Sequence, residues 1–197
     1  MMDIVQYYDG LIDEDNDPVH DCESLREYMD KWDGQGFIDR MCLDKDKTVL
    51  EVGCGTGRLL KRTAPLCKTV CGIDISPKTV QRAKKNLSEC ENISLVCADF
   101  LKHEFFVNFD IIYSSLTFMH IEDKKGAIEK IASLLVKNGK FILSTDKNQA
   151  QSIEHGSRRV LIYPDTPAKI ISFAEAAGLV LCESYETEFA DIFVFEK

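Results

Sequence analysis

Short apolar runs alternate with amphipathic stretches from Thr48 onward, and this alternation limits the possible folds more than any other feature of the sequence. Short apolar runs bounded by turn residues are typical of buried strands, and the stretches between them have helical spacing. Strands separated by helices favour parallel pairing through right-handed crossovers, which gives an open sheet covered on both faces. The expected strands are Thr48–Val52, Thr69–Ile73, Ile93–Cys97, Phe109–Ser114 and Lys140–Ser144, and the expected helices between them are Arg58–Thr63, Pro77–Cys90 and Asp123–Val136.

The end of the chain departs from this alternation. After an expected helix at Pro167–Ala177, two runs at Leu179–Glu188 and Asp191–Phe195 read as strands joined by a short turn. Two strands joined so tightly must pair antiparallel. Local signals support the helix limits, because Ser76 and Pro77 suit a helix start and Asn138-Gly139 suits a helix stop or turn. The sequence therefore predicts a doubly wound α/β fold with an antiparallel addition at its end.

The first part of the chain, residues 1–44, reads as a helical lead-in. Its start is polar and acidic, and apolar residues then recur at three-and-four spacing before two glycines interrupt them. A second short helix is expected just before residue 45. We expect this lead-in to belong to the same domain as residues 45–197. The apolar positions of the two helices are Leu25, Tyr28, Met29 and Trp32, followed by Phe37, Ile38 and Met41.

Length and charge exclude several classes of protein. A chain of 197 residues can bury a core without metals or disulfides. The net charge is −9, and basic residues gather only in isolated pairs. A protein that binds nucleic acid through its phosphates needs a basic stripe, so we expect no nucleic-acid partner.

Cysteine usage and hydropathy point to the cytoplasm. The eight cysteines are scattered without zinc-ligand spacing, so we interpret them as reduced thiols and expect no metal site. The first residues lack a basic segment followed by an apolar run, and no stretch approaches the ~18 apolar residues of a membrane span. We therefore expect a cytoplasmic protein without a membrane partner.

Candidate binding residues follow the strands, because ligands of open α/β sheets bind at the carboxyl ends of the strands. Gly53-Cys54-Gly55-Thr56-Gly57 follows the first strand, and glycines permit a tight turn and close approach of a ligand. Such a cluster also occurs in turns that need it only for packing. Asp74 ends the second strand about 20 residues after Gly53, where a carboxylate accepts ribose hydroxyls. Asp99 and Phe100 follow the third strand and offer an amine acceptor and an aromatic face, although an acidic residue there also suits a helix cap.

These residues resemble the first motif of a known family. Val49-Leu50-Glu51-Val52-Gly53-Cys54-Gly55-Thr56-Gly57 is similar, nearly residue for residue, to the first motif of class I S-adenosylmethionine-dependent methyltransferases. The resemblance covers roughly residues 45 to 145 and extends more loosely through the last helix and strand pair. It implies a seven-stranded, mostly parallel Rossmann-like sheet with a reversed last strand, and S-adenosylmethionine as cofactor.

The resemblance also implies roles for individual residues. Gly53 and Gly55 contact the methionine part, Asp74 the ribose, and Asp99 the adenine amine. Ile75 and Phe100 flank the adenine. The amino group of the methionine part is held near the end of the fourth strand, and Glu51 occupies the family's acidic position below the cofactor. The complete predicted cofactor set is Glu51, Gly53, Cys54, Gly55, Thr56, Gly57, Asp74, Ile75, Ser76, Asp99, Phe100, Ser114, Ser115 and Tyr8.

The main rival class is a nicotinamide dehydrogenase. Its G-x-G-x-x-G loop requires a glycine where this chain has Arg58. A dinucleotide also needs an anion site for its pyrophosphate at a helix start, which a methionine tail does not. Arg58 therefore favours the methyltransferase interpretation.

The acceptor side is less defined. Methyl transfer from a sulfonium needs mainly an in-line nucleophile in a dry pocket. The segment Ser115–Ile121 after the fourth strand lacks the Asn/Asp-Pro-Pro-Tyr/Phe signature of amino-group methylation on nucleobases or glutamine. His120 in this segment is the candidate catalytic base, because its unperturbed pKa lies near neutrality. A local structural hydrogen bond is the alternative role for His120.

Two further groups are candidates for the acceptor side. Tyr7 and Tyr8, with Trp32, either cover the cofactor as a lid or belong to the core. Arg158 and Arg159, near Tyr163, either clamp an anionic acceptor or remain exposed loop charges.

We expect a methyltransferase that acts on a small-molecule acceptor, because the chain is acidic and shows no added recognition domain. A protein or nucleic-acid methyltransferase and a non-catalytic S-adenosylmethionine-binding protein are the alternatives, since fold alone does not separate them. The sequence leaves the acceptor and the oligomeric state open.

Overall fold

The computed structural model describes residues 2–156 and 158–197 and is built around one seven-stranded sheet of order β3-β2-β1-β4-β5-β9-β8. Strands β1 to β5 pair in parallel, and β9 is antiparallel to both of its neighbours. The predicted doubly wound, mostly parallel sheet with an antiparallel last strand is confirmed. The strands are β1 (Thr48–Val52), β2 (Thr69–Asp74), β3 (Ile93–Cys97), β4 (Phe109–Ser115), β5 (Leu135–Asp146), β8 (Val180–Glu186) and β9 (Ala190–Glu196).

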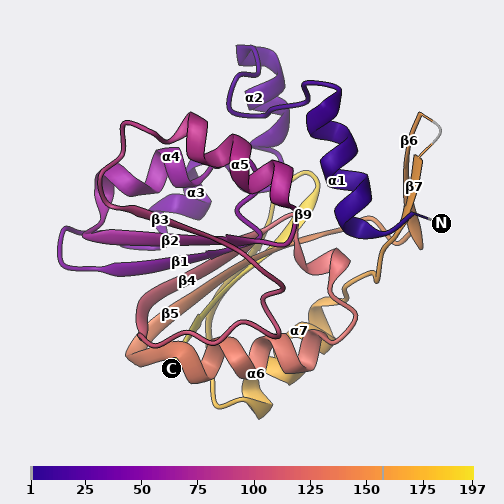
Figure 1. Cartoon of the computed structure of the whole chain (residues 1–197). Coiled ribbons are helices and arrows are strands. Elements are labelled where there is room, and N and C mark those ends of the chain that lie inside the picture. Colours follow the sequence, from indigo (N-terminus) through magenta and orange to yellow (C-terminus); the bar gives the residue numbers. More distant parts are fainter. Residues whose placement is uncertain (1, 157) are drawn as a thin grey trace.

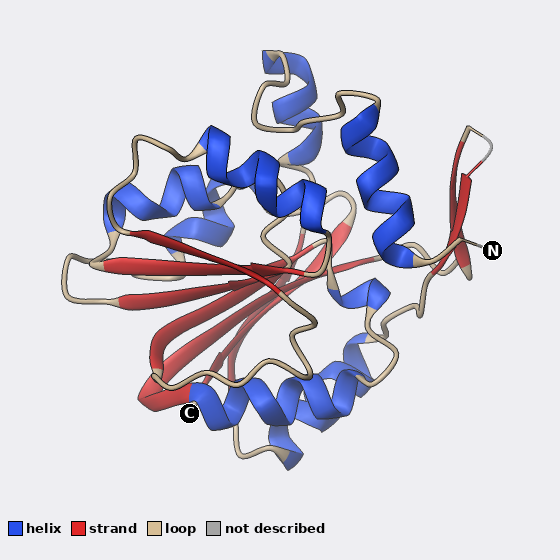
Figure 2. Ribbon diagram, viewed as in Figure 1, coloured by secondary structure: helices blue, strands red, loops and turns tan. Residues whose placement is uncertain are grey.

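Helices cover both faces of this sheet (Figure 1). One layer lies on the side of α3, α4 and α5, and the other consists of α6 and α7; Figure 2 shows the sheet between them. None of the helices within the described residues is both long and apolar enough to cross a membrane. The covering helices are α3 (Gly34–Asp39), α4 (Leu60–Thr63), α5 (Pro77–Asn86), α6 (Lys124–Leu134) and α7 (Pro167–Ala176), with 3-10 turns η1 (Ala64–Leu66) and η2 (Phe118–His120).

The strands are apolar in continuous runs because each face of the sheet has its own core. Val49 packs into the cluster that includes residues of α3, α4 and α5, whereas Leu50 and Val52 pack into the cluster with α6 and α7. All three are at most 1% exposed. Burial of each such side chain contributes about 1.5–3 kcal/mol to the free energy of folding. Because both faces of the sheet are buried, the strands appear in the sequence as continuous apolar runs.

Capping fixes the start of α5 as predicted. Ser76 has extended backbone angles and its side chain accepts a hydrogen bond from the Thr79 N–H, while Pro77 occupies the first helical turn. The predicted end of this helix at Cys90 is too late, because α5 ends at Asn86. These contacts place the loop between Asp74 and Ser76 firmly at the end of β2.

Strand β5 is longer than predicted. It begins at Leu135, directly after α6, and includes Asn138 at φ +60°. The predicted turn at Asn138-Gly139 therefore lies inside the strand, where the β4–β5 register shifts between Phe109 and Ile111. A turn-forming residue is tolerated there because the irregular pairing leaves local room for left-handed backbone.

The lead-in contains α1 (Ile4–Asp13) and α2 (Glu23–Met29) in addition to α3. Its first helix was not anticipated as a separate element. A two-stranded hairpin of β6 (Ser152–His155) and β7 (Arg158–Leu161) was also missed. Figure 1 shows α1 between α5 and this hairpin, and Met2 forms an isolated bridge with Val160. Helix α1 and the β6–β7 hairpin, which are far apart in the sequence, thus lie side by side in the structure.

We expect Gly53→Ala to lower the free energy of unfolding by about 3 kcal/mol and Gly178→Ala by about 1 kcal/mol. Both glycines have a similar φ, +76° and +83°. A Cβ at Gly53 would lie 2.0 Å from the Thr117 hydroxyl oxygen, whereas a Cβ at Gly178 meets nothing within 4 Å. Urea unfolding at pH 7 measures both values, and equal losses would show that the Thr117 contact is irrelevant.

Candidate functional site

A cavity of about 660 Å³ lies at the carboxyl ends of the strands, and the glycine loop forms part of its wall. Gly53 and Gly55 both have left-handed backbone, with φ +76° and +55°. The N–H groups of Gly53 and Cys54 donate to the Ile73 carbonyl, which holds the loop against β2. A Cβ at Gly55 would meet nothing within 4 Å, so the loop presents bare backbone to open space there.

Asp74 is fixed by backbone donors beside this loop. Its Oδ2 accepts a hydrogen bond from Gly55 N–H at 3.0 Å, and its Oδ1 accepts one from Ser76 N–H at 2.9 Å. Burial raises the pKa of Asp74 despite these bonds. Each oxygen keeps a free lone pair, so the carboxylate can accept the two hydroxyls of a ribose.

Asp99, Phe100 and Ile75 line the cavity near the ends of β3 and β2. The Asp99 carboxylate accepts from Leu101 N–H at 2.9 Å and lies 3.1 Å from the Lys102 ammonium. The helix-cap role that the sequence left open as an alternative is not what Asp99 does, because its carboxylate closes a turn and no helix lies between β3 and β4 in the described part of the chain. Phe100 is 7% exposed, whereas Ile75 is 38% exposed and free to contact a ligand.

Glu51 lines the cavity and is 3% exposed. Its carboxylate accepts a hydrogen bond from the Tyr113 hydroxyl at 2.9 Å, and Tyr113 in turn lies 2.9 Å from the Thr63 hydroxyl. Burial raises the pKa of Glu51 well above its usual range. Cys54 and Thr56 also line the cavity, and burial likewise raises the pKa of the Cys54 thiol, so that thiol is a packing group rather than a nucleophile.

Arg58 and Ser115 meet an aspartate that sequence reasoning missed. Asp33, at the start of α3, accepts two hydrogen bonds from the Arg58 guanidinium and one from the Ser115 hydroxyl at 2.7 Å. Its side chain is fully buried. No local pattern marks Asp33, because its partners lie 25 and 82 positions away.

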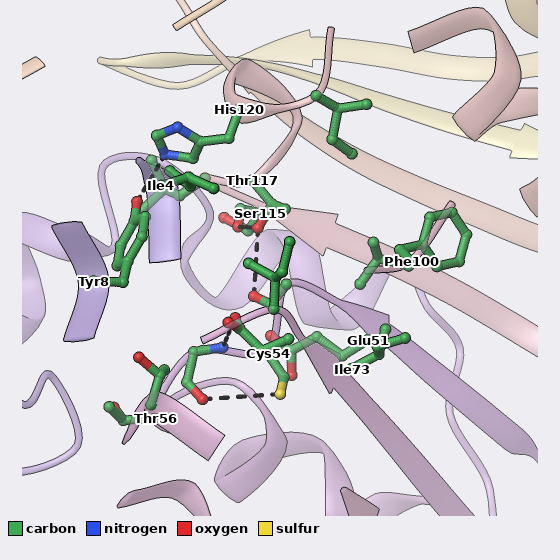
Figure 3. A pocket seen from close by; sticks show the side chains of 18 of the residues that line it. Ile4, Tyr8, Glu51, Cys54, Thr56, Ile73, Phe100, Ser115, Thr117 and His120 are labelled. Atoms are coloured by element: carbon green, nitrogen blue, oxygen red, sulfur yellow. Dashed lines mark hydrogen bonds between the residues drawn. The ribbon is translucent and has the colours of Figure 1, made fainter. Parts of the chain in front are cut away.

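Tyr8 and His120 form one pair across the cavity. The Tyr8 hydroxyl lies 2.7 Å from His120 Nε2, although the residues are 112 positions apart. Figure 3 shows both beside Ile4, with His120 at the opposite end of the view from Thr56. Burial, with a smaller effect of Lys124, lowers the pKa of His120 to about 4, so the imidazole is neutral at pH 7. Burial also raises the pKa of Tyr8, which stays protonated.

Three members of the predicted cofactor set do not line the cavity. A Cβ at Gly57 would come within 2.6 Å of Leu87, so Gly57 serves close packing. Ser76 caps α5 and its hydroxyl donates to Asp9 at 2.6 Å. The hydroxyl of Ser114 donates to the Val52 carbonyl at 2.8 Å and is fully buried. The other members line the cavity: Tyr8, Glu51, Gly53, Cys54, Gly55, Thr56, Asp74, Ile75, Asp99, Phe100 and Ser115.

The remaining candidates lie outside the cavity wall. Tyr7 is buried at 4% exposure, and Trp32 packs against Phe189 with ring centroids 4.6 Å apart. Arg158 pairs with Glu14, and Arg159 lies 3.5 Å from the Glu154 carboxylate. The arginine pair is therefore not placed as an anion clamp, and both guanidinium groups already have carboxylate partners.

The donor set suits S-adenosylmethionine. A backbone cradle at Gly55, a carboxylate with free lone pairs at Asp74 and an apolar face at Phe100 match a methionine tail, a ribose and an adenine. Across residues 2–156 and 158–197, no three His, Cys, Asp or Glu side chains gather in a way that could hold a metal ion.

The chain belongs to the methyltransferase-domain family, since residues 43–179 match the family described as "Methyltransferase domain". Membership confirms the predicted class of protein and the cofactor, S-adenosylmethionine, that this class uses. The match begins just before β1 and ends before β8, so it covers the glycine loop and every strand end at the cavity.

Curated relatives align over part of their length. Malonyl-[acyl-carrier protein] O-methyltransferase 1 of Ilyobacter polytropus is 36% identical over 109 residues, which are 53% of this chain and 40% of that protein. Nodulation protein S of Sinorhizobium fredii is 27% identical over 99 residues, 49% of this chain and 46% of that protein. The aligned region thus spans less than half of either relative.

Solved structures share the whole fold. The N-methyltransferase NodS of Bradyrhizobium japonicum WM9, solved with S-adenosyl-l-homocysteine, has a TM-score of 0.75 at 20% identity and covers 98% of this chain and 97% of its own. Magnesium protoporphyrin IX methyltransferase of Synechocystis PCC 6803, solved with bound S-adenosylmethionine, has a TM-score of 0.76 at 18% identity and covers 100% and 98%. At these identities the likeness establishes the fold.

Asp74→Ala should weaken S-adenosylhomocysteine binding by about 1–3 kcal/mol, because the ribose hydroxyls lose their charged acceptor. Titration calorimetry measures the change directly. Asp46→Ala is the matched control, since Asp46 is exposed and lies far from the cavity in the loop before β1. Unchanged affinity in Asp74→Ala would remove Asp74 from the binding site.

Proposed function

We propose that the chain transfers the methyl group of S-adenosylmethionine to a small-molecule acceptor bound beneath α1. The observation that carries this proposal is the continuity of the cavity. It runs from the glycine loop, Asp74 and Asp99 to Tyr8 and His120, so a cofactor and a second molecule can share it.

Helix α1 forms a roof over the acceptor end, which favours a small acceptor over a protein or nucleic-acid chain. The roof is attached to α5 through polar contacts. Asp9 accepts from the Ser76 hydroxyl at 2.6 Å, Asp13 pairs with Lys78 at 2.6 Å, and Asp15 pairs with Arg82 at 2.9 Å. A polymer would need an open groove where this roof lies.

The chemistry divides between cofactor and protein. S-adenosylmethionine supplies a methyl group on a sulfonium, which is a good leaving group. The protein holds the cofactor through its glycine loop and Asp74, and the apolar wall excludes water, so positioning is its main contribution to rate. Ile4, Leu11 and Met119 supply part of that wall.

His120 acts through Tyr8 in this proposal. His120 Nε2 is engaged by the Tyr8 hydroxyl, and its Nδ1 is buried without a hydrogen-bond partner among the described residues. A neutral imidazole that accepts the Tyr8 O–H leaves the Tyr8 oxygen lone pairs free for a hydrogen on the acceptor. The geometry therefore supports a positioning role for His120 and a direct contact role for Tyr8, in place of His120 as the base.

The proposal as a whole is tested by release of S-adenosylhomocysteine from S-adenosylmethionine across a panel of small acceptors. Turnover above the rate without acceptor supports it. Tight cofactor binding without turnover of any acceptor would instead favour a non-catalytic binding protein.

Tyr8→Phe should speed dissociation of S-adenosylhomocysteine about fivefold, because it removes the hydrogen bond that ties α1 to the segment after β4. Stopped-flow displacement measures the rate. Tyr28→Phe is the control, since Tyr28 is 47% exposed and packs on Trp32 away from the cavity. Equal rates in wild type and Tyr8→Phe would mean that α1 is not a lid.

His120→Leu should lower kcat about tenfold and, because it removes the same hydrogen bond as Tyr8→Phe, should speed dissociation of S-adenosylhomocysteine to a similar extent. His120→Gln should restore part of both losses by offering Tyr8 an acceptor. Because the pKa of His120 is about 4, the imidazole is neutral throughout pH 5 to 8 and gives no inflection in kcat there. A wild-type inflection near pH 6.5 that vanishes in His120→Gln would instead identify His120 as a titrating base.

A further inference from the structure

Both cationic side chains in the described cavity wall already have anionic partners. Arg58 is paired with the fully buried carboxylate of Asp33 through both of its terminal nitrogens. Lys102 lies 3.1 Å from Asp99, at the end of the site expected to hold the adenine. A carboxylate or phosphate on an acceptor therefore finds no unpaired cation among these wall residues. Burial of an anion without such a partner is costly.

The acceptor end of the cavity is bordered by acidic groups instead. Glu122 and Asp123 line the cavity from the segment after β4, and both are exposed. Lys124, which follows them, does not line the cavity. Its ammonium donates to the Phe118 carbonyl at 2.7 Å and pairs with Asp165 at 3.0 Å. The rim consequently attracts cations and repels anions, in line with the net charge of −9.

The part of the cavity wall formed by α1 and by the segment after β4 is largely apolar around the Tyr8–His120 pair. Such a wall binds an apolar body and leaves Tyr8 and His120 as the polar groups next to it. The apolar residues are Ile4, Leu11, Ile12, Leu116, Met119 and Ile121.

We infer that the acceptor is an amine carried on an apolar body, with its nitrogen at the Tyr8 hydroxyl. This inference rests on the proposed methyl transfer. The amine reaches the acidic rim as an ammonium and first loses a proton to water there. The lone pair of the resulting uncharged amine then forms the N–C bond while the C–S electron pair passes to sulfur, leaving a thioether. The positive charge moves from sulfur to the methylated ammonium, which then loses its proton to water at the acidic mouth. No strong base is required, which agrees with the neutral His120.

The test compares amines, alcohols and carboxylates that share the same apolar bodies: phenethyl, cyclohexylethyl, indolylethyl and n-octyl. Release of S-adenosylhomocysteine is measured at pH 9, where a larger share of each amine is uncharged than at pH 7. We expect turnover of at least one amine with kcat/KM at least tenfold above its matched alcohol and carboxylate. Preference for an alcohol or a carboxylate would overturn the inference and leave the proposed function standing. Absence of all turnover in a chain that binds S-adenosylhomocysteine would overturn both.

A charge reversal tests the rim separately. Glu122→Lys should raise KM for the preferred amine about tenfold, and 0.5 M NaCl should shrink that effect because screening weakens exposed charges. Glu129→Lys is the control, since Glu129 is exposed on α6 and lies outside the cavity wall. Equal KM values for Glu122→Lys and wild type would show that the rim does not select the acceptor's charge.

Discussion

Burial of the sheet on both faces is the constraint on which the rest of this structure depends. Val49, Leu50 and Val52 of β1 are all buried, and the strand's one charged side chain, Glu51, needs the Tyr113 hydroxyl as a partner. Polar groups for ligand binding therefore gather where the strands end. Because β1 lies between β2 and β4 in the sheet, the ends of these strands converge on one cavity.

The buried Asp33 joins this cavity to the lead-in. Its carboxylate accepts from Arg58, from Ser115 and from Gly34 N–H, so the start of α3, the glycine loop and the end of β4 share one anion. Removal of one partner from a buried charge pair typically lowers the free energy of unfolding by about 3–5 kcal/mol. Through Asp33 the lead-in therefore supports the binding loop and the end of β4.

The sequence allowed prediction of those parts of the fold that leave a local pattern. Two-sided burial gave apolar runs, so β1 and β3 were predicted with their observed limits. The β6–β7 hairpin was missed because its strands, Ser152–His155 and Arg158–Leu161, contain one and two apolar residues, too few to show alternation. In the site, too, only residues with a local sequence pattern could be predicted. Asp74 is recognisable from its spacing to Gly53, whereas the Tyr8–His120 pair depends on a contact across 112 positions.

The way α1 is attached explains how a roofed site can still exchange its ligands. Its ion pairs to α5, Asp13–Lys78 and Asp15–Arg82, involve carboxylates that are 60% and 88% exposed. Exposed pairs of this kind contribute about 0–1 kcal/mol each. The connection after α1 is held more firmly, because the buried Asp17 accepts from both Arg82 and Asn86. The two exposed ion pairs therefore contribute little to the attachment of α1. Movement of α1 away from α5 depends instead on breaking the Tyr8–His120 and Asp9–Ser76 hydrogen bonds, while the two cores that hold the sheet remain intact.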